Sequence, residues 1–134
     1  MKLVNDMYRV IAHDDHGEGF TDTIRFNGDH IIYKGHFPGH PVTPGVVQLQ
    51  IVHELLEYHL EMGLKLLRMP QCKFLKILDP EQTPELRIHV DYRREGEEFL
   101  VKAQGENHDE VYFKFNAFYR QGLAQESGFV KSGE

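Results

Sequence analysis

The sequence predicts an α+β fold in which one long central helix is wrapped by a curved antiparallel sheet. Two observations carry this prediction: an almost wholly apolar helical segment at residues 46–62, and a period-two alternation of apolar and polar residues that repeats after Gln71. The chain has 134 residues, a length that builds one hydrophobic core rather than two. We therefore expect a single domain at residues 1–121, followed by a flexible C-terminal tail at residues 122–134.

Two strands are expected near the N-terminus. Residues 7–13 are rich in β-forming side chains, and turn-forming residues follow at 14–17. From residue 20 to residue 26 the alternation is clearer, with Asp22 as the one polar side chain on an otherwise apolar face that includes Ile24. This second segment is therefore expected to bury one face against the core.

A loop follows these strands. Asn27-Gly28 is a strong hairpin signal, so we expect residues 30–33 to return as a short strand or extended segment. Residues 34–45 contain three prolines and three glycines. Because each proline fixes φ and removes an amide donor, this stretch is predicted to be a rigid loop.

The central helix is expected to start where this loop ends. Pro44 and Gly45 precede a segment at residues 46–62 that has no helix breaker before Gly63. A helix this apolar is usually buried on most of its sides. Its polar positions are three or four residues apart and so share one narrow stripe: Gln50, Glu54, Glu57 and Glu61.

The second half of the chain is predicted to be an antiparallel meander. Residues 64–67 are compatible with a continued helix before Pro70 stops it. Beyond Pro70 the period changes to two, and turn signals separate four candidate strands, at residues 72–78, 85–92, 97–104 and 110–119. A sheet with one apolar face is what a single helix can cover.

Composition narrows the class of protein. The formal net charge is -6 and the basic residues are scattered, which argues against nucleic acid as a partner. No apolar run approaches the roughly 20 residues that span a bilayer, and the N-terminus has no secretory signal, so we expect a cytoplasmic protein without membrane insertion. Cys72 is the one cysteine, which excludes an internal disulfide, and we expect it to be buried.

The loop and the helix start supply two kinds of chemistry. His36 offers an imidazole whose ordinary pKa lies near neutrality, which suits a general base. Free amides and the positive end of the helix dipole at Gly45 would stabilise negative charge on a carbonyl oxygen. A base and a carbonyl-polarising corner therefore come from one short stretch.

The run His36-Phe-Pro-Gly-His-Pro-Val-Thr-Pro-Gly-Val-Val-Gln-Leu-Gln50 resembles the signature of the hotdog-fold 3-hydroxyacyl-acyl carrier protein dehydratases. The resemblance implies that His36 is the catalytic base and that the Gly45 amide holds the thioester carbonyl. It also implies a homodimer, or a higher even oligomer, in which His36 of one chain faces Gln50 of the other. The residues expected to line the substrate are Phe37, Pro38, Gly39, Pro44 and Val46.

One position departs from this pattern, because Gln50 stands where the family carries Glu or Asp. An amide donates hydrogen bonds but transfers no proton at neutral pH, and general acid catalysis is typically worth about 10²–10⁴ in rate. Two other ways to supply the missing acid remain open. Protonated His36 returns its proton to the leaving hydroxyl, or Glu54, one helical turn further on, reaches the substrate.

Three functions follow from this site. The first is dehydration of a 3-hydroxyacyl thioester carried by acyl carrier protein or coenzyme A. The second is hydrolysis of an acyl thioester on the same fold, and the third is an acyl-binding partner subunit without activity of its own. No metal or redox cofactor is implied: a site formed by His36 and His40 lacks an obvious third ligand, and His13 and His16 are interpreted as loop residues without a partner.

Overall fold

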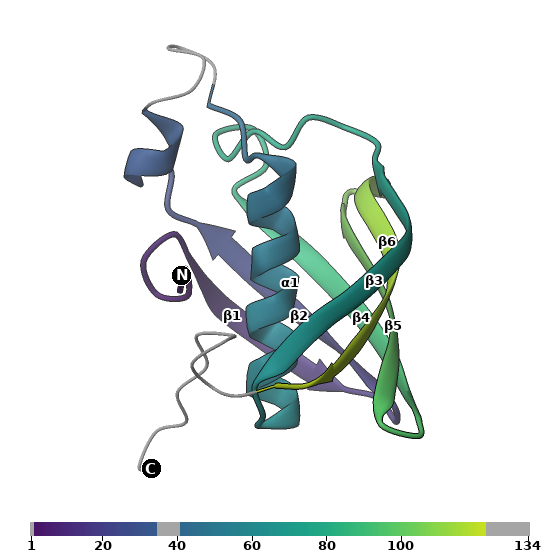
Figure 1. The fold of residues 1–134 in the computed structure, drawn as a ribbon. Helices are drawn as coiled ribbons and strands as arrows, with labels where there is room; N and C mark the ends of the chain where they lie inside the picture. The colour runs from purple at the N-terminus through teal and green to yellow at the C-terminus, as the bar shows by residue number, and fades with distance from the viewer. Residues whose placement is uncertain (1, 35–40, 123–134) are drawn as a thin grey trace.

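The computed structural model describes residues 2–34 and 41–122 of the chain. Within them, the α-helix α1 (Gly45–Leu60) lies against a six-stranded sheet (Figure 1). A 3-10 helix, η1 (Ile31–Tyr33), precedes it. The six strands are β1 (Tyr8–Asp15), β2 (Gly19–Phe26), β3 (Leu64–Phe74), β4 (Glu85–Glu95), β5 (Glu98–Asn107) and β6 (Glu110–Gln121).

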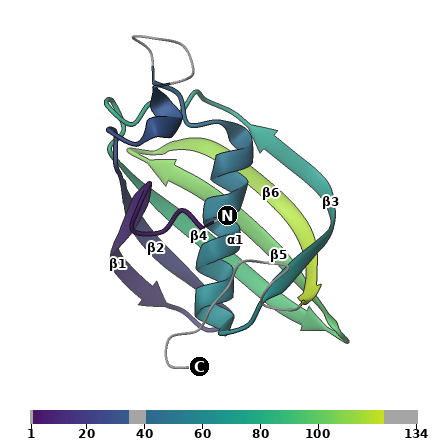
Figure 2. The same cartoon turned by 60° about the vertical axis from the view of Figure 1, so that its left-hand side comes forward.

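The strands follow the order β1-β2-β4-β5-β6-β3, and every neighbouring pair is antiparallel. The sheet curves around α1, which runs across its concave face (Figure 2). This arrangement confirms the predicted α+β hotdog architecture. Strands β4, β5 and β6 form the predicted meander, whereas β3 crosses to the far side of β6 instead of pairing with β4.

The core lies between α1 and the sheet. Phe20, Asp22, Ile24 and Phe26 of β2 are all buried, as the alternation of their segment predicts. The helix faces them with apolar side chains that are also buried: Val47, Ile51, Val52, Leu55 and Leu56. Because each buried aliphatic side chain contributes about 1.5–3 kcal/mol, this contact is the main attachment of α1 to the sheet.

Strands β1 and β2 are joined by a hairpin turn. This turn contains Gly17, which has a φ of 64° that glycine adopts without strain.

The segment after β2 differs from the prediction. Residues 30–33 do not form a strand: η1 starts there, because the Nδ1 atom of His30 accepts a hydrogen bond from the Ile32 amide, 3.1 Å away. The Asn27 side chain accepts from the Asp29 amide and closes a local turn, so Asn27-Gly28 makes no hairpin.

Strand β3 differs more strongly from the prediction. The sequence is compatible with a continued helix at residues 64–67 and predicts a strand at 72–78, but one strand runs from Leu64 to Phe74 and includes Pro70. Proline is tolerated because β3 is an edge strand, paired only with β6 within the described residues, and its register shifts between Arg68 and Gln71. Cys72 lies on this edge and is exposed, so the expectation that it is buried is wrong.

The end of α1 fixes the start of β3. Glu61 adopts a left-handed conformation, with φ 55° and ψ 43°, and stops the helix. The carboxylate of Glu57 is buried, accepts from the Leu64 amide at 2.8 Å, and lies 3.2 Å from Nε2 of His53. The predicted polar stripe is therefore enclosed at Glu57.

No helix in the described part of the chain has the length and apolar character needed to cross a membrane.

Candidate active site

The predicted site residues divide into two groups. His36, Phe37, Pro38 and Gly39 lie outside the described residues, as does His40. The structure places the others along the first three turns of α1 and just before it: Pro44, Gly45, Val46, Gln50 and Glu54. The described geometry is therefore that of the two ends of the loop and of the helix that follows it.

The helix α1 starts at Gly45, directly after the loop. Pro44 occupies the N-cap position in an extended conformation and its side chain caps no amide. Its carbonyl oxygen accepts from the amides of Val47 and Gln48, at 3.0 and 3.1 Å. The amides of Gly45 and Val46 have no acceptor among residues 2–34 and 41–122. Together with the helix dipole, these two amides form a corner suited to a carbonyl oxygen that gains negative charge.

Gly45 lies in close contact with the side chain of Phe74. A Cβ atom at this position would lie 2.7 Å from the Cζ atom of Phe74, below any ordinary carbon contact. The Phe74 ring comes from the end of β3 and is about half exposed. Because residue 45 is glycine, the Phe74 ring can lie against the helix start. No side chain of residue 45 then shields the backbone amides.

A buried network joins the two ends of the loop. The hydroxyl of Tyr33, before the loop, lies 2.8 Å from the hydroxyl of Thr43, after it. The Thr43 carbonyl accepts from the Gln48 side chain at 2.8 Å, and its amide donates to the Leu78 carbonyl at 2.8 Å. Burial raises the pKa of Tyr33 to about 12, so its hydroxyl keeps its proton at neutral pH. These contacts hold both ends of the segment that carries His36.

Sequence reasoning missed this network. Tyr33 and Thr43 show no spacing that pairs them, because they are ten positions apart and share no regular element. Gln48 carried a usable signal: it is the one polar residue in the first turn of an apolar helix, and it is buried to 4% exposure. Its Oε1 atom has no hydrogen-bond partner within the described residues. A buried amide oxygen of this kind is costly unless a group outside those residues satisfies it.

Gln50 is linked to Glu54. The Gln50 side-chain amide donates to one carboxylate oxygen of Glu54 at 3.0 Å, and Gln50 is half-buried. The Glu54 carboxylate is buried and accepts three further hydrogen bonds, from the amides of Leu3 and Val4 at 2.7 and 2.9 Å and from the Tyr8 hydroxyl at 3.0 Å. Burial and the nearby Glu54 charge raise the pKa of Tyr8, so this hydroxyl remains a donor. Glu54 thus anchors the N-terminal segment and orients Gln50.

The described groups of this site are therefore amides, hydroxyls and one fully hydrogen-bonded carboxylate. They bind and orient, and they polarise a carbonyl, while the proton-transferring group expected from the sequence is His36. Side chains with the chemistry of a metal site gather elsewhere, at the other end of α1, around His13 and His59.

A family model described as ApeI-like, ApeI dehydratase, matches residues 12–114. The matched part of the chain contains the whole loop, α1, strands β2 to β5 in full, and parts of β1 and β6. It therefore includes His36, Gly45 and Gln50. Comparison with curated protein sequences gave no significant match.

Solved structures with the same fold include a chain of the dehydratase heterocomplex ApeI:P from Xenorhabdus doucetiae. It has a TM-score of 0.71 at 17% identity, covering 84% of this chain and 96% of that one. An uncharacterized protein from Erwinia carotovora subsp. atroseptica has a TM-score of 0.59 at 19% identity, with 81% and 90% covered. A putative thioesterase from Shewanella oneidensis has a TM-score of 0.53 at 10% identity, with 85% and 82% covered. At these identities the likeness shows the fold.

Proposed function

Because the chain belongs to the ApeI-like dehydratase family, we propose that it dehydrates 3-hydroxyacyl thioesters carried by acyl carrier protein to trans-2-enoyl thioesters. The observation that supports this most strongly is the helix start. There two amides that have no acceptor within the described residues, at Gly45 and Val46, follow a loop whose ends are held by the Tyr33 and Thr43 hydroxyls. A thioester carbonyl bound at these amides would have its α-carbon near the segment that carries His36.

The reaction follows from these groups. His36 takes a proton from the α-carbon, and the electron pair of that C–H bond forms the new double bond while the amides stabilise the enolate-like oxygen. The bond between the β-carbon and its hydroxyl breaks, and this oxygen takes the proton back from the His36 imidazolium and leaves as water. Gln50 orients the leaving hydroxyl, and Glu54 holds Gln50 through its 3.0 Å hydrogen bond. In this account Glu54 is a positioning residue.

We place this reaction in a homodimer, in which His36 of one subunit faces Gln50 of the other. The edge strand β3 supports an interface, since it exposes apolar side chains at Leu66, Leu67 and Phe74 along its 11 residues. Exposed apolar side chains on an edge strand offer a surface that a second subunit can cover. Val46, on the first turn of α1, is also 72% exposed, as a residue that contacts substrate or a second subunit would be.

One observation favours a second candidate. Gln50 replaces the carboxylate expected of a dehydratase, so the chain is alternatively an acyl-binding subunit whose active partner supplies the acid. The heteromeric ApeI:P assembly supports this alternative, because it shows that a chain of this fold works in a dehydratase complex with a different subunit. Thioester hydrolysis, suggested by thioesterases among the fold neighbours, is a third activity of the same scaffold.

These candidates are separated by two substrates. A short 3-hydroxyacyl thioester is offered to the purified protein and the enoyl product is followed by absorbance, while a saturated acyl thioester is offered separately and free thiol is measured. We expect enoyl product from the first and no thiol from the second. Thiol release from the saturated substrate would instead identify a thioesterase, and neither product, with the acyl thioester still bound, would identify the partner subunit.

A further inference from the structure

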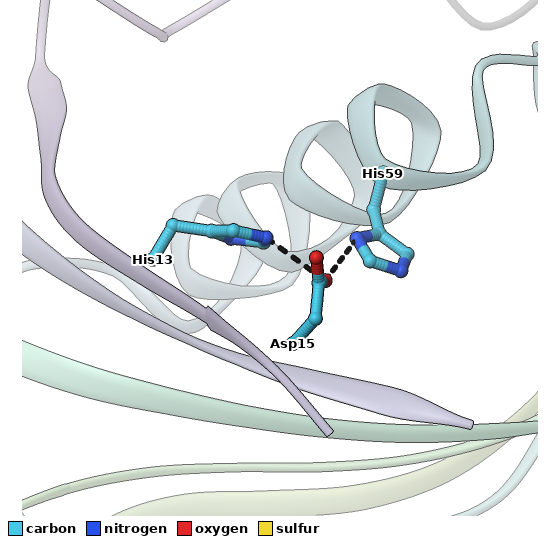
Figure 3. A group of neighbouring side chains, drawn as sticks. All are labelled: His13, Asp15 and His59. Atoms are coloured by element: carbon cyan, nitrogen blue, oxygen red, sulfur yellow. Dashed lines mark hydrogen bonds and ion pairs between the residues drawn. The ribbon is translucent and has the colours of Figure 1, made fainter. Parts of the chain in front are cut away.

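We propose that His13, Asp15 and His59 form a binding site for a divalent transition-metal ion of the Zn²⁺ class, separate from the candidate active site. His13 and Asp15 lie at the end of β1, and His59 lies in the last turn of α1. The two imidazoles approach Asp15 from opposite sides (Figure 3). Sequence reasoning left His13 without a partner, because two of the residues that meet it, Asp22 and His59, are on β2 and on α1.

The distances suit a metal ion. Nε2 of His13 and Nδ1 of His59 lie 2.9 and 3.3 Å from the same oxygen, Oδ1 of Asp15. The three ligand atoms all lie within 4.8 Å of one another. In a tetrahedral site with bonds of 2.0–2.1 Å, ligand atoms are separated by about 3.3 Å, so small side-chain rotations would complete the site. His13 and Asp15 are two residues apart on one strand and therefore project to the same side.

A buried carboxylate orients the first ligand. Nδ1 of His13 is hydrogen-bonded to Oδ1 of Asp22, and Asp22 is only 5% exposed. When Nδ1 donates to Asp22, the lone pair of Nε2 points at Asp15. Either a proton on Nε2 or a bound metal ion satisfies both of these acceptors. Metal-bound histidines characteristically donate their other ring nitrogen to a carboxylate, which fixes the tautomer and strengthens the ligand.

Packing orients the second ligand. The His59 ring stacks on Phe20 with a centroid separation of 4.4 Å, and its Nε2 lies 3.4 Å from the Tyr92 hydroxyl. This contact occupies Nε2, so Nδ1 faces Asp15. The His59 side chain is 17% exposed, whereas those of His13 and Asp15 are 43% and 65% exposed. An ion can therefore enter from solvent, and the site leaves room for water as a fourth ligand.

The position of the site separates it from the proposed reaction. His59 is 14 residues from Gly45, which corresponds to roughly 21 Å along the axis of α1. An ion held here would connect the end of β1 to the last turn of the helix. Because an ion that binds only the folded state stabilises it, metal binding should raise the unfolding temperature without a direct effect on dehydration.

The test is titration of untagged, chelator-treated protein with Zn²⁺ by calorimetry, with Co²⁺ absorption as a second readout of ligand geometry. We expect one ion per chain. Asp15→Asn, at an exposed position that leaves folding intact, should weaken binding at least 10-fold, and His59→Gln should do the same. Asp22→Asn should weaken it about 10- to 100-fold through loss of orientation. His89→Ala is the matched control, since His89 is a partly exposed histidine bound to Thr21 and Glu106.

Thermal unfolding keeps the test decisive if a variant is poorly stable. Zn²⁺ should raise the unfolding temperature of the wild-type chain and of His89→Ala, and should not raise that of Asp15→Asn. The proposal is overturned if the wild-type chain binds no ion, or if Asp15→Asn and His59→Gln bind Zn²⁺ as tightly as the wild type. Neither result depends on whether the protein is a dehydratase.

Discussion

The hydroxyl of Tyr33 lies 2.8 Å from the hydroxyl of Thr43, and this buried contact closes the loop that carries His36. The two residues are ten positions apart, on either side of that loop. Gln48 extends the contact into α1, whose first turn offers the Gly45 amide. One small polar network therefore ties both ends of the segment that contains His36 to the start of α1.

Tyr33→Phe should lower kcat more than it changes KM, because the substrate corner remains while the loop loses one of its anchors. The variant leaves the Thr43 hydroxyl buried without its partner, which costs about 1–3 kcal/mol of stability. Tyr112→Phe is a matched control. It removes an equivalent buried contact, 2.8 Å between the hydroxyls of Tyr112 and Thr83, away from the loop. Equal losses of kcat in the two variants would show that the Tyr33 contact acts only through stability.

Gly45→Ala should reduce turnover and destabilise the start of α1. The new methyl group would lie 2.7 Å from the Phe74 ring, so either the ring or the first helical turn must move. Overpacking of this kind typically costs about 1–3 kcal/mol, measured here by chemical denaturation. Gly45→Ala combined with Phe74→Ala should recover part of both losses. No recovery in the double variant would mean that the methyl group interferes with something other than Phe74.

Glu54→Gln should be strongly destabilising although it changes no volume. The carboxylate accepts from the Leu3 and Val4 amides and from Tyr8, and an amide side chain can replace only part of this acceptance. Hydrogen bonds to a charged group contribute about 1.5–3 kcal/mol each. Glu97→Gln, on the exposed turn before β5, should change the free energy of unfolding by less than about 0.5 kcal/mol. Similar effects of the two changes would remove the anchoring role of Glu54.

The pair of Glu106 with Arg87 should make stability depend on acid pH. The hydrogen bond from Arg87 holds the pKa of Glu106 below its ordinary value of 4.5, so the ionised form stabilises the folded state. That contribution is present above pH 4.5 and is lost as the pH falls through the lowered pKa of the folded state. The difference in unfolding free energy between wild type and Glu106→Gln should therefore shrink below pH 4.5. A difference that stays constant down to pH 2 would contradict this assignment.

Local patterns predicted much of the fold. The apolar run gave α1 within two residues at each end, and the strands β2, β4, β5 and β6 follow from alternation. The buried position of Asp22 also follows, because it shares a face with Phe20 and Ile24. In each case the spacing of apolar side chains along the sequence matches the repeat of the helix or strand that forms. The local sequence is therefore enough to predict the element.

The sequence-based predictions are wrong where contacts between residues far apart in the sequence determine the structure. Strand β3 contains Pro70 and exposes nearly every residue, so its first half has no strand pattern and left a continued helix open at residues 64–67. Its pairing with β6 makes it a strand. The partner of His13 on β2 and the contact between Tyr33 and Thr43 have no local signature for the same reason. In the candidate site, the position of the Gly45 amide at a helix start could be predicted from the sequence. The roles of Gln48 and Glu54 could not, because their hydrogen-bond partners are set by tertiary contacts.

The most direct test of the proposed function is the rate at which the purified protein converts a short 3-hydroxyacyl thioester to its enoyl form, compared among wild type, His36→Ala and Gln50→Glu. We expect turnover by the wild type and a loss of about 10²–10⁴ in His36→Ala, the usual contribution of general acid–base catalysis. An unchanged rate in His36→Ala would contradict the account. So would an inactive wild type with an active Gln50→Glu, which would identify a partner subunit that has lost its acid.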